Sequence, residues 1–144
     1  MPIVNRIAEF EAELIEWRHQ LHKFPELGFE EHQTAEFIAE KLNQMGLEVN
    51  KGLAGTGVVA TLTVGSGNGP KIGLRADMDA LPILERSEFE HASKNPGVMH
   101  ACGHDGHTTM LLGAAKYLAE TKNFDGTVQF LSLIHISEPT RPNT

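Results

Sequence analysis

Apolar residues recur at helical spacing in three segments of the chain. The first segment predicts one amphipathic helix that ends before Pro25, with its apolar positions at Ile3, Ile7, Phe10, Leu14, Trp17 and Leu21. The second runs from about Glu30 to Met45, and Gly46 is well placed as its C-terminal stop. The third runs from Gly106 to about Thr121. We interpret all three apolar stripes as core packing.

Short runs of β-type residues follow the second helix and predict strands. The runs are LEVNK, GVVATLTV, KIGLRAD and, after the third helix, GTVQF. The segment GSGNGP between the second and third runs predicts a hairpin turn. It lacks the G-x-G-x-x-G spacing and does not open a helix, so we do not expect a phosphate cradle there. The order helix, strands, helix, strand predicts an α/β fold.

Composition limits the classes of function. The 144 residues are 40% hydrophobic and 22% charged, which fits one ordinary domain with a core. A net charge of -7 leaves no basic stripe, so nucleic acid is not expected as a partner. No apolar stretch reaches the roughly 20 residues of a membrane helix. A single cysteine and the absence of a signal-peptide pattern favour a cytoplasmic location.

An acidic pair follows the third predicted strand. In RADMDALP, Asp77 and Asp79 lie at the end of KIGLR, where open α/β sheets usually place ligands. The pair has a structural alternative, in which Asp77 forms a salt bridge with Arg75 and Asp79 caps a turn.

The densest group of potential ligands is HACGHDGH, residues 100–107. Cys102 and His104 are two positions apart, so in an extended loop their side chains point to the same side and can chelate one ion. His100 and His107 add donors. Asp79 or Asp105 could accept the second ring N–H of a ligating histidine. A thiolate with an imidazole suits zinc, cobalt or nickel, and manganese where carboxylates complete the shell.

Two other interpretations of this segment stay open. In the first, the histidines cap the helix or face solvent around a buried, inert cysteine. In the second, Cys102 is a nucleophile with His104 or His107 as its base. A metal site accounts better for the aspartates after the preceding strand.

Four motifs occur in an order that resembles a known family. They are HxxPELGFEE, RADMDALP, HACGHDGH and DGTVQF, which begin at His22, Arg75, His100 and Asp125. Together they resemble the metal-dependent N-acyl amino acid amidohydrolases, which include hippurate hydrolase, aminoacylase and the auxin-conjugate hydrolases. The resemblance covers residues 1–130. It implies the N-terminal part of a zinc-peptidase-like (phosphorylase/hydrolase-like) α/β catalytic domain, without the lid and dimerisation domain.

The resemblance also implies an activity and residue roles. The reaction would be hydrolysis of a small N-acyl amino acid to a carboxylic acid and an amino acid, and complete members would form homo-oligomers. Cys102 and His104 fall on metal-binding positions of a two-ion site, and Asp79 falls on an aspartate that orients a ligand. Supporting roles are expected for Asp77, His100, Asp105 and His107. We expect His22 and PELGFEE to fix a helix–helix turn.

The chain departs from the family pattern after DGTVQF. The family continues into a proline-alanine-glutamate-glutamate segment that supplies the general base, whereas this chain reads LSLIHISEPTRPNT. Neither His135 nor Glu138 matches a family position. We therefore interpret residues 131–144 as an aberrant tail, and we expect the chain to be inactive alone. The alternative function is a small non-catalytic metal-binding module, and the source reading frame beyond residue 130 discriminates between the two.

Overall fold

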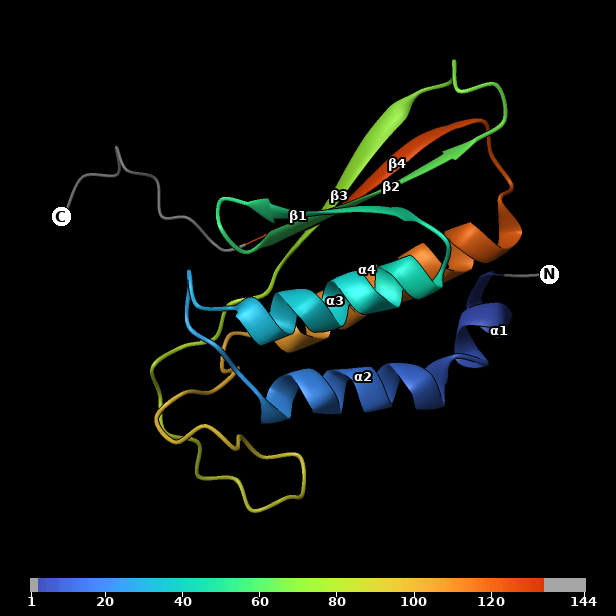
Figure 1. Cartoon of the computed structure of the whole chain (residues 1–144). Helices are drawn as coiled ribbons and strands as arrows, with labels where there is room; N and C mark the ends of the chain where they lie inside the picture. Colours follow the sequence, from blue (N-terminus) through green and yellow to red (C-terminus); the bar gives the residue numbers. More distant parts are fainter. Residues whose placement is uncertain (1–2, 134–144) are drawn as a thin grey trace, which may run out of the picture.

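A four-stranded sheet with four helices on one side makes up the described part of the chain, residues 3–133 of a computed structural model (Figure 1). The elements are α1 (Ile3–Ala8), α2 (Glu11–Lys23), α3 (His32–Gln44), β1 (Glu48–Leu53), β2 (Gly57–Val64), β3 (Lys71–Asp77), α4 (His104–Thr121) and β4 (Gly126–Leu133). α3 packs against β1 and β2, α4 packs mainly against β3, and α2 packs on α4. The predicted α/β class is confirmed.

The prediction of one continuous helix before Pro25 is wrong. The helix is interrupted at Glu9 and Phe10. There the backbone hydrogen bonds span three residues instead of four, from the Glu9 N–H to the Arg6 carbonyl (3.2 Å) and from the Phe10 N–H to the Ile7 carbonyl (2.9 Å). The interruption buries Phe10, which is 4% exposed. The Lys116 ammonium of α4 lies 4.5 Å from the Phe10 ring centroid. Tertiary packing of Phe10 therefore overrides the local periodicity.

The second and third predicted helices are confirmed as α3 and α4. Gly46 ends α3 with a φ of +85°, and its N–H donates to the Asn43 carbonyl at 2.9 Å. Glu26 supports the other end of α3, because its Oε1 accepts from the Thr34 N–H and hydroxyl, both at 2.6 Å. This is the helix–helix turn role expected for the PELGFEE segment.

The predicted hairpin at GSGNGP is wrong. β2 and β3 are not neighbours, because the strand order is β1-β2-β4-β3, with β4 antiparallel to β2 and parallel to β3. The GSGNGP segment instead crosses the start of β4. Asp125 accepts from the Ser66 N–H and hydroxyl at 3.1 Å, and a Cβ on Gly69 would lie 2.0 Å from the Asp125 carbonyl oxygen. Gly69 is needed for close backbone approach.

The core lies between the sheet and the helix layer. Phe130 of β4 is fully buried and pairs with Ala60 of β2 on one side and Leu74 of β3 on the other. Ile38 and Leu42 of α3 and Leu112 of α4 belong to the same buried cluster. Among residues 3–133 no helix is long and apolar enough to cross a membrane.

Two large apolar side chains of α4, one buried and one exposed, test this packing. Leu112 is fully buried, so Leu112→Ala should lower the free energy of unfolding by about 2–5 kcal/mol. Met110 is 64% exposed, so Met110→Ala should change it by no more than about 0.5 kcal/mol. Urea unfolding of both variants measures the difference. Equal losses would contradict the assigned orientation of α4.

Candidate metal centre

The candidate residues lie on the segment 78–103, which connects β3 to α4. This segment contains no helix or strand, but backbone contacts fix its ends. The Met78 N–H extends the β3–β4 ladder by donating to the Leu133 carbonyl at 2.9 Å, and Leu81 and Met99 exchange two bonds of 2.9 Å. Long irregular segments in compact domains are usually functional.

His104 and Asp79 form the central contact of the candidate site. His104 is the first residue of α4, and its Nδ1 lies 3.1 Å from Asp79 Oδ1 and 2.8 Å from the Asp79 carbonyl oxygen. Both partners are acceptors, so Nδ1 carries the hydrogen and Nε2 keeps a free lone pair. The structure thus brings Asp79 and the HACGHDGH segment into contact, as the prediction that Asp79 could accept a ring N–H requires.

Cys102 lies beside this pair in sequence but not in an extended loop. Gly103 has a φ of +88° and α4 begins at the next residue, so the predicted extended geometry of Cys102 and His104 is wrong. The alternative of a buried cysteine is also wrong, because Cys102 is exposed. No described residue makes a hydrogen bond with its thiol.

Asp77 and His107 take no part in the contact between His104 and Asp79. Asp77 pairs with Arg75, whose Nε and Nη2 both lie 3.0 Å from Asp77 Oδ1, as the structural alternative expected. His107 is exposed one turn into α4, with its ring centroid 5.9 Å from that of His104.

His100 is a buried imidazole without a partner. It is 5% exposed, and neither ring nitrogen makes a hydrogen bond with a described residue. Burial lowers its pKa to about 4, and His22 and His104 act in the same direction, whereas Asp105 and Asp79 oppose the shift. His100 is therefore neutral at pH 7, and one of its ring nitrogens holds a lone pair that accepts from no described residue.

Glu31, the last residue of PELGFEE, is a second buried group, and the motif gave it no individual role. It is fully buried, its Oε1 accepts from the Thr56 hydroxyl at 3.0 Å, and its Oε2 has no partner among the described residues. Burial raises the pKa of Glu31, and the charge of Asp79 adds to that rise.

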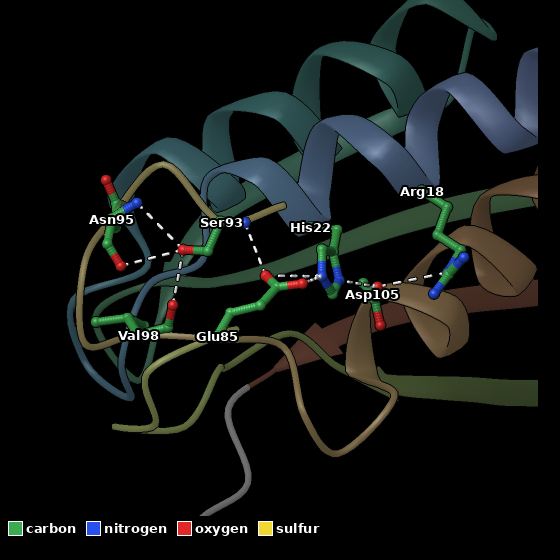
Figure 2. Close-up of polar contacts among 7 residues, drawn as sticks. All are labelled: Arg18, His22, Glu85, Ser93, Asn95, Val98 and Asp105. Atoms are coloured by element: carbon green, nitrogen blue, oxygen red, sulfur yellow. Dashed lines mark hydrogen bonds and ion pairs between the residues drawn. The ribbon is translucent and has the colours of Figure 1, made fainter. Parts of the chain in front are cut away.

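A third buried group joins α2 to the candidate site. His22 Nδ1 lies 2.9 Å from Asp105 Oδ2, and its Nε2 lies 3.0 Å from Glu85 Oε2 (Figure 2). Glu85 could not be expected from the sequence, because it lies in an irregular segment without periodicity. Asp105 thus contacts His22 rather than the ring of His104.

The described residues supply an incomplete set of metal donors. Within residues 3–133, no three or more His, Cys, Asp or Glu side chains are arranged to hold a metal ion. Residues 131–133 of the predicted tail complete β4, and residues 134–144, with His135 and Glu138, lie outside the described part.

A protein-family model matches the C-terminal part of the chain. Residues 73–143 match peptidase family M20/M25/M40. The chain is similar to this family, and the resemblance drawn from the four motifs is confirmed. Because the match runs to residue 143, the interpretation of residues 131–144 as foreign stays a prediction.

Two curated relatives are similar over most of this chain. It is 51% identical over 128 residues to a hippurate hydrolase of Campylobacter jejuni, with 89% of this chain and 33% of the relative covered. It is 50% identical over 131 residues to an N-acyl-L-amino acid amidohydrolase of Geobacillus stearothermophilus, with coverage of 90% and 35%. The chain therefore spans about a third of the length of these relatives.

Solved structures share the fold. A Bacillus subtilis protein described as a dinuclear metal-binding peptidase of the M20 family matches with a TM-score of 0.81 and 41% identity, covering 87% of this chain and 35% of that one. A putative aminohydrolase from methicillin-resistant Staphylococcus aureus matches with a TM-score of 0.87 and 39% identity, covering 96% and 37%. The described fold is thus that of M20 family enzymes.

The unpartnered His100 predicts a pH effect on stability. Its pKa is about 4 when folded and 6.5 as a free group, so protonation favours the unfolded chain. In the metal-free chain this group should remove about 3 kcal/mol of stability as the pH falls from 6.5 to 4. His100→Gln should flatten that decline relative to His32→Gln, an exposed control on α3. If the free energy of unfolding, measured with denaturant at each pH, declines equally in the two variants, the assignment is contradicted.

Proposed function

We propose that this chain contributes the Cys102–His104 half of the active site of a metal-dependent amidohydrolase that acts on N-acyl amino acids. The observation that carries the proposal is the contact between His104 Nδ1 and Asp79 at 3.1 Å, next to the exposed Cys102. The names of the relatives, a hippurate hydrolase and an N-acyl-L-amino acid amidohydrolase, supply the substrate class.

The donor chemistry fits a divalent ion. Asp79 fixes the hydrogen of His104 on Nδ1, which leaves the Nε2 lone pair for a metal, as in carboxylate–histidine–metal arrangements. Cys102 offers a sulfur that no described residue engages. The other ligands would come from residues outside 3–133, because the described part holds no group of three donors.

Each residue then has a distinct task in amide hydrolysis. A bound divalent ion would activate water and polarise the amide carbonyl. His104 and Cys102 would bind it, and Asp79 would orient the His104 ring. The neutral His100 would keep the buried side of the site free of an additional positive charge. A general base is not among the residues to which we assign roles, so we propose that the 144-residue chain is inactive alone.

Several finer points belong to this proposal. The complete site would hold two ions of zinc, manganese, cobalt or nickel. The Bacillus subtilis relative is described as dinuclear, which supports the number but not the identity. The substrate would be a small molecule, without nucleic acid or membrane. Cytoplasmic location and homo-oligomeric assembly of the complete protein stay predictions.

Two alternatives remain distinguishable. A small metal-binding module would bind the ion through the same residues without catalysis. A cysteine nucleophile would need a base in contact with its thiol, and within residues 3–133 no hydrogen bond joins Cys102 to a histidine. The thiol mechanism is therefore the weaker alternative.

An assay of N-benzoylglycine hydrolysis tests the proposal. The protein would be residues 1–130 continued by the uninterrupted reading frame of the source gene. We expect chelation to abolish activity, a divalent ion to restore it, and His104→Ala to prevent restoration. A matched His32→Gln variant should keep the activity, because His32 is exposed on α3.

Other outcomes of this assay identify the alternatives. Activity that survives chelation but is lost on alkylation of Cys102 would replace the metal site by a thiol mechanism. Metal binding without hydrolysis of any N-acyl amino acid tested would favour the binding module.

A further inference from the structure

We propose that His22, held between Asp105 and Glu85, is a positioning residue of the candidate metal centre. It would tie the segment 78–103 and the first turn of α4 to α2, and thereby set the places of Cys102 and His104. The inference rests on the proposed function only where it calls the site a metal centre.

The His22 ring is held at both ends inside the protein. Its Nδ1 lies 2.9 Å from Asp105 Oδ2, and its Nε2 lies 3.0 Å and 3.1 Å from the two Glu85 carboxylate oxygens. The three side chains are 5%, 3% and 2% exposed, in the order His22, Asp105, Glu85. Figure 2 shows the ring lying between the two carboxylates. Such geometry leaves the ring no freedom to rotate.

The electrostatics of the cluster make it sensitive to removal of any member. Ionised carboxylates can only accept, so a ring N–H of His22 is the donor in such a contact. Burial tends to raise the pKa of Glu85, but hydrogen bonds from His22 and from the Ser93 N–H outweigh burial, and the pKa is lowered. Arg18 Nε lies 3.4 Å from Asp105 Oδ2, so positive and negative groups alternate. Removing one charge leaves a buried partner uncompensated.

One end of the cluster is fixed directly to a candidate ligand. Asp105 follows His104 in the chain, and its backbone carbonyl accepts from the Thr109 hydroxyl at 2.8 Å. The contact between Asp105 and His22 therefore joins the first turn of α4 to α2. His104 moves with that turn.

The other end fixes the path of the chain toward Cys102. Glu85 accepts from the Ser93 N–H at 2.7 Å, and the Ser93 hydroxyl donates to the carbonyls of Asn95 and Val98 at 3.0 and 2.7 Å (Figure 2). These bonds fold the segment just before the Leu81–Met99 bridge. Only three residues separate that bridge from Gly103.

The same segment is also fastened to the end of α2. The Lys94 N–H donates to the Lys23 carbonyl at 2.7 Å, and the Asn95 side chain donates to the Pro25 carbonyl at 2.8 Å. His22 thus lies where α2, the segment 78–103 and α4 meet. Its hydrogen bonds are to Asp105 and Glu85 and not to Cys102 or His104, so it would act by positioning.

The test compares Glu85→Gln with Glu13→Gln in the monomeric fraction of the 144-residue chain. Glu85→Gln removes a charge from the cluster and preserves the shape of the side chain. Glu13→Gln is the matched control, because Glu13 of α2 forms an exposed ion pair with Lys116 of α4. We expect Glu85→Gln to weaken cobalt(II) binding about 10-fold or more. Amide hydrogen exchange in residues 98–104 should become faster in the same variant. Both readouts should be unchanged in Glu13→Gln.

The outcomes separate this inference from the proposed function. A lower melting temperature in Glu85→Gln, with cobalt affinity and exchange in residues 98–104 equal to those of Glu13→Gln, would overturn the positioning role. If the unsubstituted 144-residue chain binds no cobalt, Cys102 and His104 do not hold the ion without the remaining ligands, and exchange in residues 98–104 alone decides the positioning role. If Glu85→Gln does not fold, Ser93→Ala replaces it. This variant removes the bonds from the Ser93 hydroxyl to the Asn95 and Val98 carbonyls and the bond that its oxygen accepts from the Asn95 N–H. It should accelerate exchange in residues 98–104, and no acceleration would overturn the inference.

Discussion

Parallel pairing of β3 with β4 is the constraint on which the rest of the structure depends. Parallel neighbours cannot be joined by a tight turn, so the chain must cross over between them. The crossover here consists of the segment 78–103 and α4. Every residue proposed to bind metal or orient a ligand, Asp79, Cys102 and His104, lies on this connection. The fold therefore produces the site as a consequence of its strand order.

Two neighbouring polar clusters use this arrangement. Asp79 and His104 form the cluster that faces the proposed ion, and His22, Asp105 and Glu85 form the one that holds the crossover to α2. His104 and Asp105 are adjacent residues of α4, and each belongs to one of the two clusters. Buried charged clusters contribute little net stability, and breaking one is costly. Their presence here is better explained by the need to hold a site than by the stability of the core, which Phe130 and the α3 and α4 side chains supply.

Local patterns predicted the elements well, but not the contacts between distant segments. Periodicity predicted α3, α4 and all four strands, because an amphipathic face depends on the pattern of residues that are close in the sequence. It failed at Phe10, where packing near Lys116 interrupts a helix, and at GSGNGP, where β4 enters between β2 and β3. For the site, spacing and motif context brought Asp79 and His104 together. Glu85 could not be found, because an irregular segment carries no pattern that reveals its partner.

The most direct test of the account is the X-ray absorption spectrum of the 144-residue chain loaded with zinc. We predict one sulfur ligand at about 2.3 Å together with imidazole nitrogen at about 2.0–2.1 Å. Cys102→Ser should remove the sulfur contribution, and His104→Ala should reduce the nitrogen contribution. A first shell of oxygen and nitrogen that is identical in the unsubstituted chain and in Cys102→Ser would contradict the central claim that Cys102 and His104 form half of a metal centre.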